Sequence, residues 1–286
     1  MNKVGFIGVG IMGKSMVRNL MKAGFELHIY ARTKSKVEDV ISEGAQFHES
    51  IKDCVQDCDA VITIVGFPQD VEEVYFDEGN ILDSAKKGAY LIDMTTTSPQ
   101  IAEKIYAEGT KRGFHVMDAP VTGGDTGAKA GTLSILVGGE KEDYEACMPL
   151  FEAMGTNINY QGKAGCGQHC KLANQIMIAG TLSGVCEALT YAKEQGLDPE
   201  VFMKSVATGA AGSKQLDTFG PKILKDDYAP GFFMKHFIKD MKLALIEANR
   251  KGLSLDVLSM VLANYEELEQ EGYGDLGTQA LIKYYE

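Results

Sequence analysis

The chain has 286 residues, of which 45% are hydrophobic and 24% are charged, and this balance is typical of a globular protein rather than a disordered or fibrous one. Its formal net charge of −12 argues against nucleic acid or an anionic membrane as a partner, because both repel an acidic surface. No run of eighteen consecutive apolar residues is present, so we expect no segment that spans a membrane.

The first half of the chain alternates short β-branched runs with amphipathic stretches. Strands are predicted at residues 4–8, 26–30, 60–65, 89–93, 114–118 and 133–138, with helical patterns between most of them. Such alternation is typical of an α/β domain in which a parallel, doubly wound sheet carries helices on both faces. We therefore expect residues 1–163 to form an α/β domain.

The strand signals stop after Gly162. Helical periodicity follows at residues 166–194, 199–207, 213–225, 236–251 and 256–270, with Gly or Pro between the segments. The sequence therefore predicts an all-α domain over residues 164–286. The boundary is expected near residue 163, where several glycines precede the longest helix.

The first predicted strand leads directly into GVGIMG, in which Gly8, Gly10 and Gly13 have the G-x-G-x-x-G spacing around Ile11 and Met12. The spacing by itself is a weak signal. Because this motif follows a strand and opens a helix, however, its backbone N–H groups can hold the pyrophosphate of a dinucleotide. A glycine-rich turn without a ligand is the alternative. The context favours a Rossmann-type domain that binds NAD or NADP.

The end of the second predicted strand, HIYARTKSK, indicates which coenzyme is preferred. An NAD-binding fold usually places an acid here for the ribose 2′-hydroxyl, but this position is Ala31. Arg32, Thr33 and Lys36 follow, and two cations with a hydroxyl suit the 2′-phosphate of NADP. Ordinary surface charges at a helix start are the alternative. The pattern favours NADP, with NAD possible.

After the fifth strand, DAPVTGG offers a turn that can bind a carboxylate. Gly123 and Gly124 leave their backbone N–H groups accessible, and Thr122 adds a hydroxyl. A tight turn without a ligand is the alternative interpretation.

The longest predicted helix begins GCGQHCKLANQ and places Lys171 where burial would be expected. Asn174 at i+3 and Gln175 at i+4 share its face of the helix. A buried ammonium beside a substrate carbonyl can donate a proton as hydride arrives and accept it in the reverse direction. A lysine that extends from a helix end to solvent is the alternative.

The cysteines favour free thiols and no metal site. Six cysteines lie scattered through predicted helices and strands, in a chain large enough to fold without disulfides, so we expect a reducing, cytoplasmic environment. Cys166, His169 and Cys170 are close in sequence, but no further pair with suitable spacing follows and neighbouring helical residues point in different directions. We therefore predict no metal.

Four separated motifs together resemble the β-hydroxyacid dehydrogenase family: FIGVGIMGKSMVRNL, DAPVTGG, GCGQHCKLANQ and HFIKDMKLAL. The resemblance covers essentially the whole chain. It implies that Lys171 is the catalytic acid and base, that Thr122, Gly123 and Gly124 hold the substrate, and that the cofactor is lined by Val65, Thr96 and Lys239. Some relatives have Asn four residues after the lysine, where this chain has Gln175, so the resemblance leaves open which amide contacts substrate.

Within the family, GAAGSKQLDTFGPKILKDDYAPGFF and the ending GDLGTQALIKYYE are most similar to tartronate semialdehyde reductases. This similarity implies that Ser213 lies near the far end of the substrate. The glutamate that phosphogluconate dehydrogenases have seven residues after the lysine is Ile178 here, so we expect hydride transfer without decarboxylation.

The expected function is NADPH-dependent reduction of tartronate semialdehyde, a small carboxylate-bearing substrate, to glycerate. Oxidation of 3-hydroxyisobutyrate or reduction of succinic semialdehyde is the alternative within enzymes. A non-catalytic nucleotide-binding interaction module is the alternative of another class, and the presence of Lys171 weakens it. The resemblance also favours a homodimer or homotetramer built through the helical domain.

Overall fold

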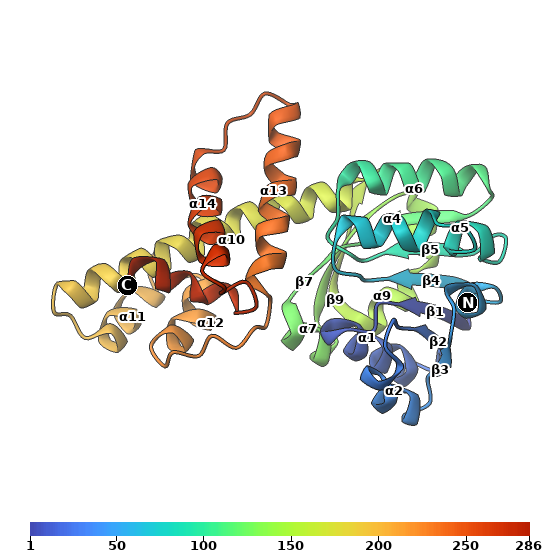
Figure 1. Ribbon diagram of the computed structural model, residues 1–286, viewed down its shortest axis with the longest axis horizontal. Helices are drawn as coiled ribbons and strands as arrows, with labels where there is room; N and C mark the ends of the chain where they lie inside the picture. Colours follow the sequence, from blue (N-terminus) through green and yellow to red (C-terminus); the bar gives the residue numbers. More distant parts are fainter. The chain divides into compact units, whose positions relative to one another are not determined.

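The computed structural model describes all residues, Met1–Glu286, and divides into two compact units, Met1–Lys171 and Leu172–Glu286 (Figure 1). The first unit contains every strand, and the second is built from helices. The expected order, an α/β domain followed by an all-α domain, is confirmed. The division between the units falls inside helix α10 (Cys166–Glu194), because the first turn of this helix is hydrogen bonded to the sheet of the first unit.

The first unit is organised around one nine-stranded sheet with the order β3-β2-β1-β4-β5-β6-β8-β7 and with β9 beside β8. From β3 to β6 all neighbouring strands are parallel, which is the arrangement of a dinucleotide-binding fold. The strands are β1 (Lys3–Ile7), β2 (Glu26–Tyr30), β3 (Gln46–His48), β4 (Ala60–Thr63), β5 (Tyr90–Asp93), β6 (His115–Asp118), β7 (Val121–Thr122), β8 (Leu133–Gly138) and β9 (Gly155–Gly162).

The predicted strands are all present, but the sheet is larger and less uniform than the sequence indicates. Strands β3, β7 and β9 are additional, and they are short or largely exposed, so they lack the apolar runs that mark the buried strands. Strand β8 runs antiparallel to β6 and β7. The expectation of a purely parallel sheet is wrong at this edge, because the connection through α7 (Gly124–Ala130) is too short to return the chain for parallel pairing.

Helices cover both faces of the sheet, and alternate strand residues supply the two cores. Ile62 packs on one side of β4 and Val61 on the other, as the two-residue period of a strand requires. Figure 1 shows α4, α5 and α6 on one side of the sheet and α1 and α2 on the other. Besides α7 and the start of α10, the helices of this unit are α1 (Ile11–Lys22), α2 (Glu38–Ser42), α3 (Ile51–Val55), α4 (Pro68–Phe76), α5 (Ile81–Ser84), α6 (Pro99–Lys111), α8 (Lys141–Ala146) and α9 (Met148–Met154), with a 3₁₀ turn at Lys34–Lys36.

The second unit encloses its own core between helices. Phe237 meets Tyr265 edge to face with a centroid distance of 5.4 Å, and both are fully buried with Met241 and Leu182. The predicted helices are confirmed, with ends that differ by a few residues at two of them. They are α10, α11 (Pro199–Ala207), α12 (Lys214–Ile223), α13 (Met234–Arg250) and α14 (Asp256–Gln270), followed by a 3₁₀ segment at Thr278–Tyr285.

Helix α10 meets a length and composition criterion for crossing a membrane, with a mean hydropathy of 1.2 over 18 residues. It does so without an uninterrupted apolar run of that length, because the mean averages over polar positions. Within the same window 44% is buried inside the protein, and Leu182, Cys186 and Leu189 belong to the core of the second unit. A buried core helix passes the same test, so the helix is weak evidence for a membrane span.

We predict opposite effects on stability from two Gly→Ala substitutions. A Cβ on Gly138, at the end of β8, would lie 2.6 Å from Asp118 Oδ1 and 2.8 Å from the Gly167 nitrogen. Gly138→Ala should therefore lower the free energy of unfolding by about 1–3 kcal/mol. A Cβ on Gly184, within α10, would meet nothing within 4 Å, so Gly184→Ala should raise helix stability by up to about 1 kcal/mol. Urea unfolding of both variants tests this, and equal losses would contradict it.

Candidate active site

The carboxyl ends of β1, β2, β4, β5 and β6 lie at one edge of the sheet, because these strands are parallel. The loops that follow them carry most of the residues predicted from the sequence. In this strand order the chain leaves β1 and β4 toward opposite sides of the sheet, and ligands bind in the crevice that opens at such a point. This edge is therefore the candidate site of the first unit.

The loop after β1 depends on glycines that allow close backbone contacts. Gly8 has a φ of +100°, and a Cβ on it would lie 2.0 Å from the Ile64 oxygen. A Cβ on Gly13 would lie 2.1 Å from the Gly8 oxygen, whereas one on Gly10 would meet nothing within 4 Å. Gly8 and Gly13 are thus required by the fold itself, and Gly10 leaves open space beside the start of α1.

The start of α1 offers unshared hydrogen-bond donors to this space. Gly10 is the N-cap and provides no side-chain acceptor, and the first turn has no acidic residue. The neighbouring Ile11 is exposed, and Met12 is partly buried. Free N–H groups and the positive end of a helix dipole favour an anion. These residues fit the pyrophosphate of NAD or NADP.

The loop after β2 carries the residues expected at the 2′-position of the ribose. Arg32, Thr33 and Lys36 are all exposed. The guanidinium of Arg32 lies 2.5 Å from Asp70 Oδ1 and 3.2 Å from Glu73 Oε2, both on α4. Its side chain is 62% exposed, so solvent screens these pairs. Neither carboxylate could be identified from the sequence alone, because α4 is distant from β2 along the chain.

A buried polar network joins the loops that follow β4 and β5. The Val65 N–H donates to Thr95 Oγ1 (3.0 Å). Asp93, at the end of β5, accepts from Thr63 Oγ1 (2.8 Å) and from the Thr95 N–H (3.1 Å). Burial raises the pKa of Asp93 to about 6, although the hydrogen bonds from Thr95 and Thr63 oppose the shift. The network holds the loops that carry Val65 and the half-buried Thr96.

Asp118 fixes the first turn of α10 to the sheet. Its carboxylate accepts the Gly165 N–H at Oδ1 and the Gln168 N–H at Oδ2, each at 2.8 Å. Burial raises the pKa of Asp118, and the two backbone hydrogen bonds oppose this shift. A Cβ on Gly167 would lie 2.3 Å from the Leu136 oxygen, so the glycine allows the close approach.

Lys171 belongs to the anchored start of this helix and is 7% exposed. A lysine at this depth does not simply extend to solvent, which was the alternative considered from the sequence. Gln168, three residues earlier on the same face, is fully buried and is bonded through its side chain to the loop after β5. Lys171 therefore follows closely on a side chain that bonds to the loop after β5, and it belongs to the same unit as the glycine-rich loop.

The DAPVTGG stretch forms the turn from β7 into α7. Gly123 has a φ of +129° and is the N-cap of α7, and Gly124 has a φ of +61°. These angles favour glycine, because a side chain would be strained at a positive φ. Asp125 follows in the first turn, and Lys129 Nζ lies 2.7 Å from its Oδ2. Lys129 therefore offsets an acidic charge next to the predicted carboxylate-binding turn.

The second unit contains a chain of buried polar groups around the predicted amides. Asn174 Nδ2 donates to Gln175 Oε1 (2.8 Å), and Gln175 Nε2 donates to Asp240 Oδ2 (2.7 Å). Lys239 Nζ lies 3.1 Å from Asp240 Oδ1, within ion-pair distance. Both the oxygen and the nitrogen of the Gln175 amide thus take part in hydrogen bonds. Asp240 was missed from the sequence, where only its position after Lys239 in HFIKDMKLAL could have indicated it.

Ser213, which is predicted to lie near the substrate, has a structural role at the start of a helix. It is the N-cap of α12, and its Oγ accepts the Leu216 N–H at 3.1 Å. The hydroxyl hydrogen is still available for donation, because the cap uses only an acceptor lone pair.

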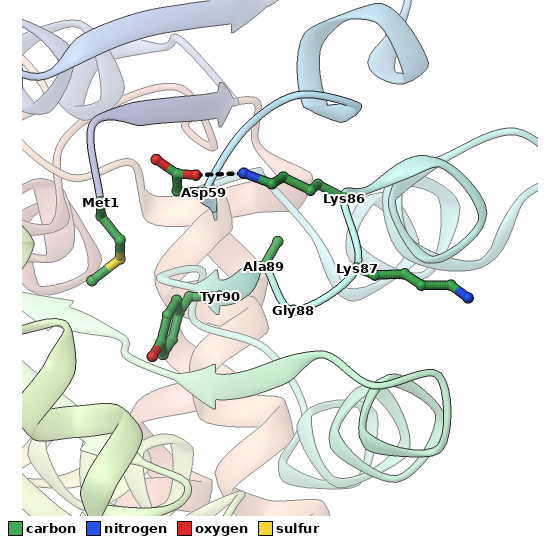
Figure 2. Close-up of a pocket in the computed structure, with 7 residues that line it drawn as sticks. All are labelled: Met1, Asp59, Lys86, Lys87, Gly88, Ala89 and Tyr90. Carbon is green, nitrogen blue, oxygen red and sulfur yellow. Dashed lines mark hydrogen bonds and ion pairs between the residues drawn. The ribbon is translucent and has the colours of Figure 1, made fainter.

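The opposite edge of the sheet carries a hollow of about 230 Å³ that is unrelated to these residues. Figure 2 shows its lining, in which Lys86 Nζ lies 2.8 Å from Asp59 Oδ1 near the amino ends of β4 and β5. No residue predicted from the sequence as part of a site lines this hollow.

Known proteins match both halves of the chain. Residues 3–162 match the model of the NAD binding domain of 6-phosphogluconate dehydrogenase. Residues 165–285 match the model described as NAD-binding of NADP-dependent 3-hydroxyisobutyrate dehydrogenase.

Individual relatives match over nearly their full length. The uncharacterized oxidoreductase YkwC of Bacillus subtilis is 49% identical over 98% of this chain and 97% of its own. The 2-hydroxy-3-oxopropionate reductase of Escherichia coli is 35% identical over 98% and 96%. Among solved structures, 3-hydroxyisobutyrate dehydrogenase of Mycobacterium tuberculosis with L-serine has a TM-score of 0.91, with 27% identity over 100% and 99% of the two chains. The chain therefore belongs to the β-hydroxyacid dehydrogenase family and is an NAD(P)-dependent oxidoreductase that acts on the CH–OH group of a hydroxyacid.

Proposed function

We propose that this enzyme uses NADPH to reduce tartronate semialdehyde to glycerate. The observation that carries the proposal is the burial of Lys171 on the turn of α10 that Asp118 and Gln168 fix to the carboxyl edge of the sheet. A relative of matching length is named for 2-hydroxy-3-oxopropionate, which is tartronate semialdehyde. The six unpaired cysteines suit the reducing cytoplasm in which we place the reaction.

Lys171 acts as the general acid in the proposed reduction. NADPH, which the loop with Gly8, Gly10 and Gly13 would hold, would supply a hydride to the aldehyde carbon. The Lys171 ammonium donates one proton to the carbonyl oxygen as negative charge develops there, so that C=O becomes CH–OH. In the reverse direction the neutral amine accepts the hydroxyl proton. One hydride and one proton account for the two hydrogens that the product gains.

The substrate carboxylate is assigned to the turn at Thr122, Gly123 and Gly124. Two glycine N–H groups at the start of α7 and one hydroxyl can all donate to a carboxylate. We assign contacts with the rest of the substrate to Asn174 and Ser213. Gln175 supports Asn174 in this proposal, because both of its polar atoms are already engaged.

The coenzyme preference rests on the loop after β2. Arg32 with Thr33 and Lys36 offers two cations and a hydroxyl to a 2′-phosphate, and no acid stands on this loop to repel it. Val65 and Thr96 are assigned to the coenzyme on loops of the same edge, and Lys239 is assigned to it from the second unit. The carboxylates of Asp70 and Glu73 share Arg32 and therefore oppose part of its attraction for the phosphate.

Replacing Lys171 should abolish most catalysis without releasing the coenzyme. General acid catalysis contributes typically about 10²–10⁴-fold, so Lys171→Ala should lower kcat by at least about 10²-fold. NADPH affinity, measured by fluorescence titration, should change little, because the pyrophosphate loop lies on β1 and α1. Lys163→Ala removes an exposed lysine just before α10 and should keep normal kcat. A Lys171→Ala enzyme with normal kcat would refute the assignment.

Replacing Arg32 should weaken the preference for NADPH. One lost charge-assisted hydrogen bond costs roughly 1.5–3 kcal/mol, so Arg32→Ala should lower the NADPH to NADH ratio of kcat/KM by about tenfold to a hundredfold. The ratio is measured with each coenzyme at saturating substrate. A wild-type preference for NADH, or an unchanged ratio in the variant, would overturn the NADPH assignment.

A second substitution in the same experiment should shift the ratio in the opposite direction. Glu73→Gln removes one carboxylate that competes for Arg32, and an exposed pair of this kind is worth about 0.2–1 kcal/mol, so the ratio should rise by up to about fivefold. Glu72→Gln is the matched control. Its carboxylate lies 3.0 Å from Lys104 Nζ, so its loss should leave the ratio unchanged.

The substrate should be short and hydroxylated. We expect kcat/KM to fall from tartronate semialdehyde to methylmalonate semialdehyde and further to succinic semialdehyde. Ser213→Gly removes the hydroxyl and retains most of the capping energy. A buried hydroxyl left without a partner costs roughly 1–3 kcal/mol. If Ser213 is buried with the substrate, the variant should therefore discriminate about 5- to 150-fold less against methylmalonate semialdehyde. A tenfold or greater preference for succinic semialdehyde would favour the longer-acid alternative.

A further inference from the structure

Gln168 has hydrogen-bond partners on the loop after β5 and at the end of strand β6. It is 0% exposed. Its Oε1 accepts the Thr97 N–H at 3.0 Å, and its Nε2 donates to the Thr95 carbonyl at 2.7 Å. Its backbone N–H donates to Asp118 Oδ2 at 2.8 Å. The side chain therefore bonds to the loop after β5 while the backbone bonds to the end of β6.

These contacts connect the turn that carries Lys171 with the loops assigned to the coenzyme. Thr95 and Thr97 flank Thr96, and Thr95 Oγ1 also accepts the Val65 N–H from the loop after β4. Lys171 follows Gln168 by three residues on one face of α10. A displacement of the Gln168 amide would therefore move the lysine relative to both loops.

We propose that Gln168 is a positioning residue for catalysis, which holds Lys171 in register with the Val65 and Thr96 loops for proton transfer. This inference rests on the proposed role of Lys171. The chemistry of the side chain explains the choice of residue. The Thr95 carbonyl needs a donor and the Thr97 N–H needs an acceptor. An amide provides both in a single planar group. An apolar side chain of similar volume would leave both loop groups buried and unpaired.

The first test is Gln168→Met, which keeps the volume and removes both side-chain hydrogen bonds. A misplacement of about 1 Å at a reacting group can cost about a hundredfold, so kcat should fall by about 10- to 100-fold. NADPH affinity should change by less than about threefold, since the anchors for the pyrophosphate and the 2′-phosphate lie on the loops after β1 and β2. Unchanged kcat in the folded variant would overturn the proposal.

Gln279→Met is the matched control for loss of stability. Gln279 is 1% exposed, and its Nε2 donates to the Asp227 and Ala229 carbonyls at 2.9 and 3.2 Å. Its replacement removes a comparable buried clamp that has no assigned part in the site. Both Gln→Met variants should lose thermal stability, and only Gln168→Met should lose kcat. Equal losses of kcat in the two would show that Gln168 is merely structural.

Gln168→Glu provides a second test that does not depend on the folding of Gln168→Met. A protonated carboxyl has one donor and one acceptor, like the amide, whereas the ionised form has acceptors only. The Asp118 carboxylate on β6 accepts the backbone N–H of this residue, and Asp93 on β5 accepts the N–H of its neighbour Thr95. Burial near these like charges favours the protonated form. The activity of Gln168→Glu relative to wild type should therefore be highest at acidic pH and fall as pH rises. A ratio independent of pH would contradict the proposal.

A double variant distinguishes this inference from the proposed function. If Gln168 acts through Lys171, adding Gln168→Met to Lys171→Ala should lower kcat by less than about threefold more, because residues that act as a unit are not additive. If the double variant lost a further 10- to 100-fold of kcat, as Gln168→Met does alone, Gln168 would act on another group. The proposal would then fail, while the role of Lys171 would stand. Normal activity of Lys171→Ala alone would instead refute the proposed function.

Discussion

The Asp118 carboxylate is the contact on which the rest of the site depends. It ends strand β6 and accepts two backbone N–H groups at the start of α10. One side chain therefore joins the end of this strand to the start of a helix that is distant in the sequence. Free N–H groups at a helix start favour an anion, which explains why a carboxylate is tolerated at 3% exposure. Without a glycine at 138 and 167 the two elements could not approach closely enough for these bonds to form.

Buried polar groups, rather than apolar packing, set the relative positions of the loops at the carboxyl edge. Asp93 and Thr95 connect the loops after β4 and β5, and Gln168 connects them to α10. Burial of polar groups is unfavourable unless they are hydrogen bonded, so the bonds that these groups form leave few alternative arrangements of the loops. The raised pKa of Asp93, about 6, reflects this burial. The active edge is therefore specified by directional bonds.

The charges of the enzyme and of its ligands have the same sign overall. The net charge is −12, and both coenzyme and substrate are anions, so binding relies on local donors that outweigh the general repulsion. In the binding site that we propose, these donors are backbone N–H groups at the starts of α1 and α7 and the exposed cations after β2. The pairing of Arg32 with two carboxylates shows that even this cation is partly neutralised.

The sequence by itself determined the two-domain order, the buried strands, the five α-helices of the second domain and the burial of Lys171, because these depend on local signals: apolar period, glycine spacing and helical position. It could not reveal β3, β7 and β9, whose short or exposed runs carry no such signal. The partners of the site residues, among them Asp70 for Arg32, Asp240 for Gln175 and Thr95 for Gln168, were decided only by the tertiary structure. Each of these pairs joins positions far apart in the chain, and a hydrogen bond between them depends on how strands and helices pack, which no local pattern records.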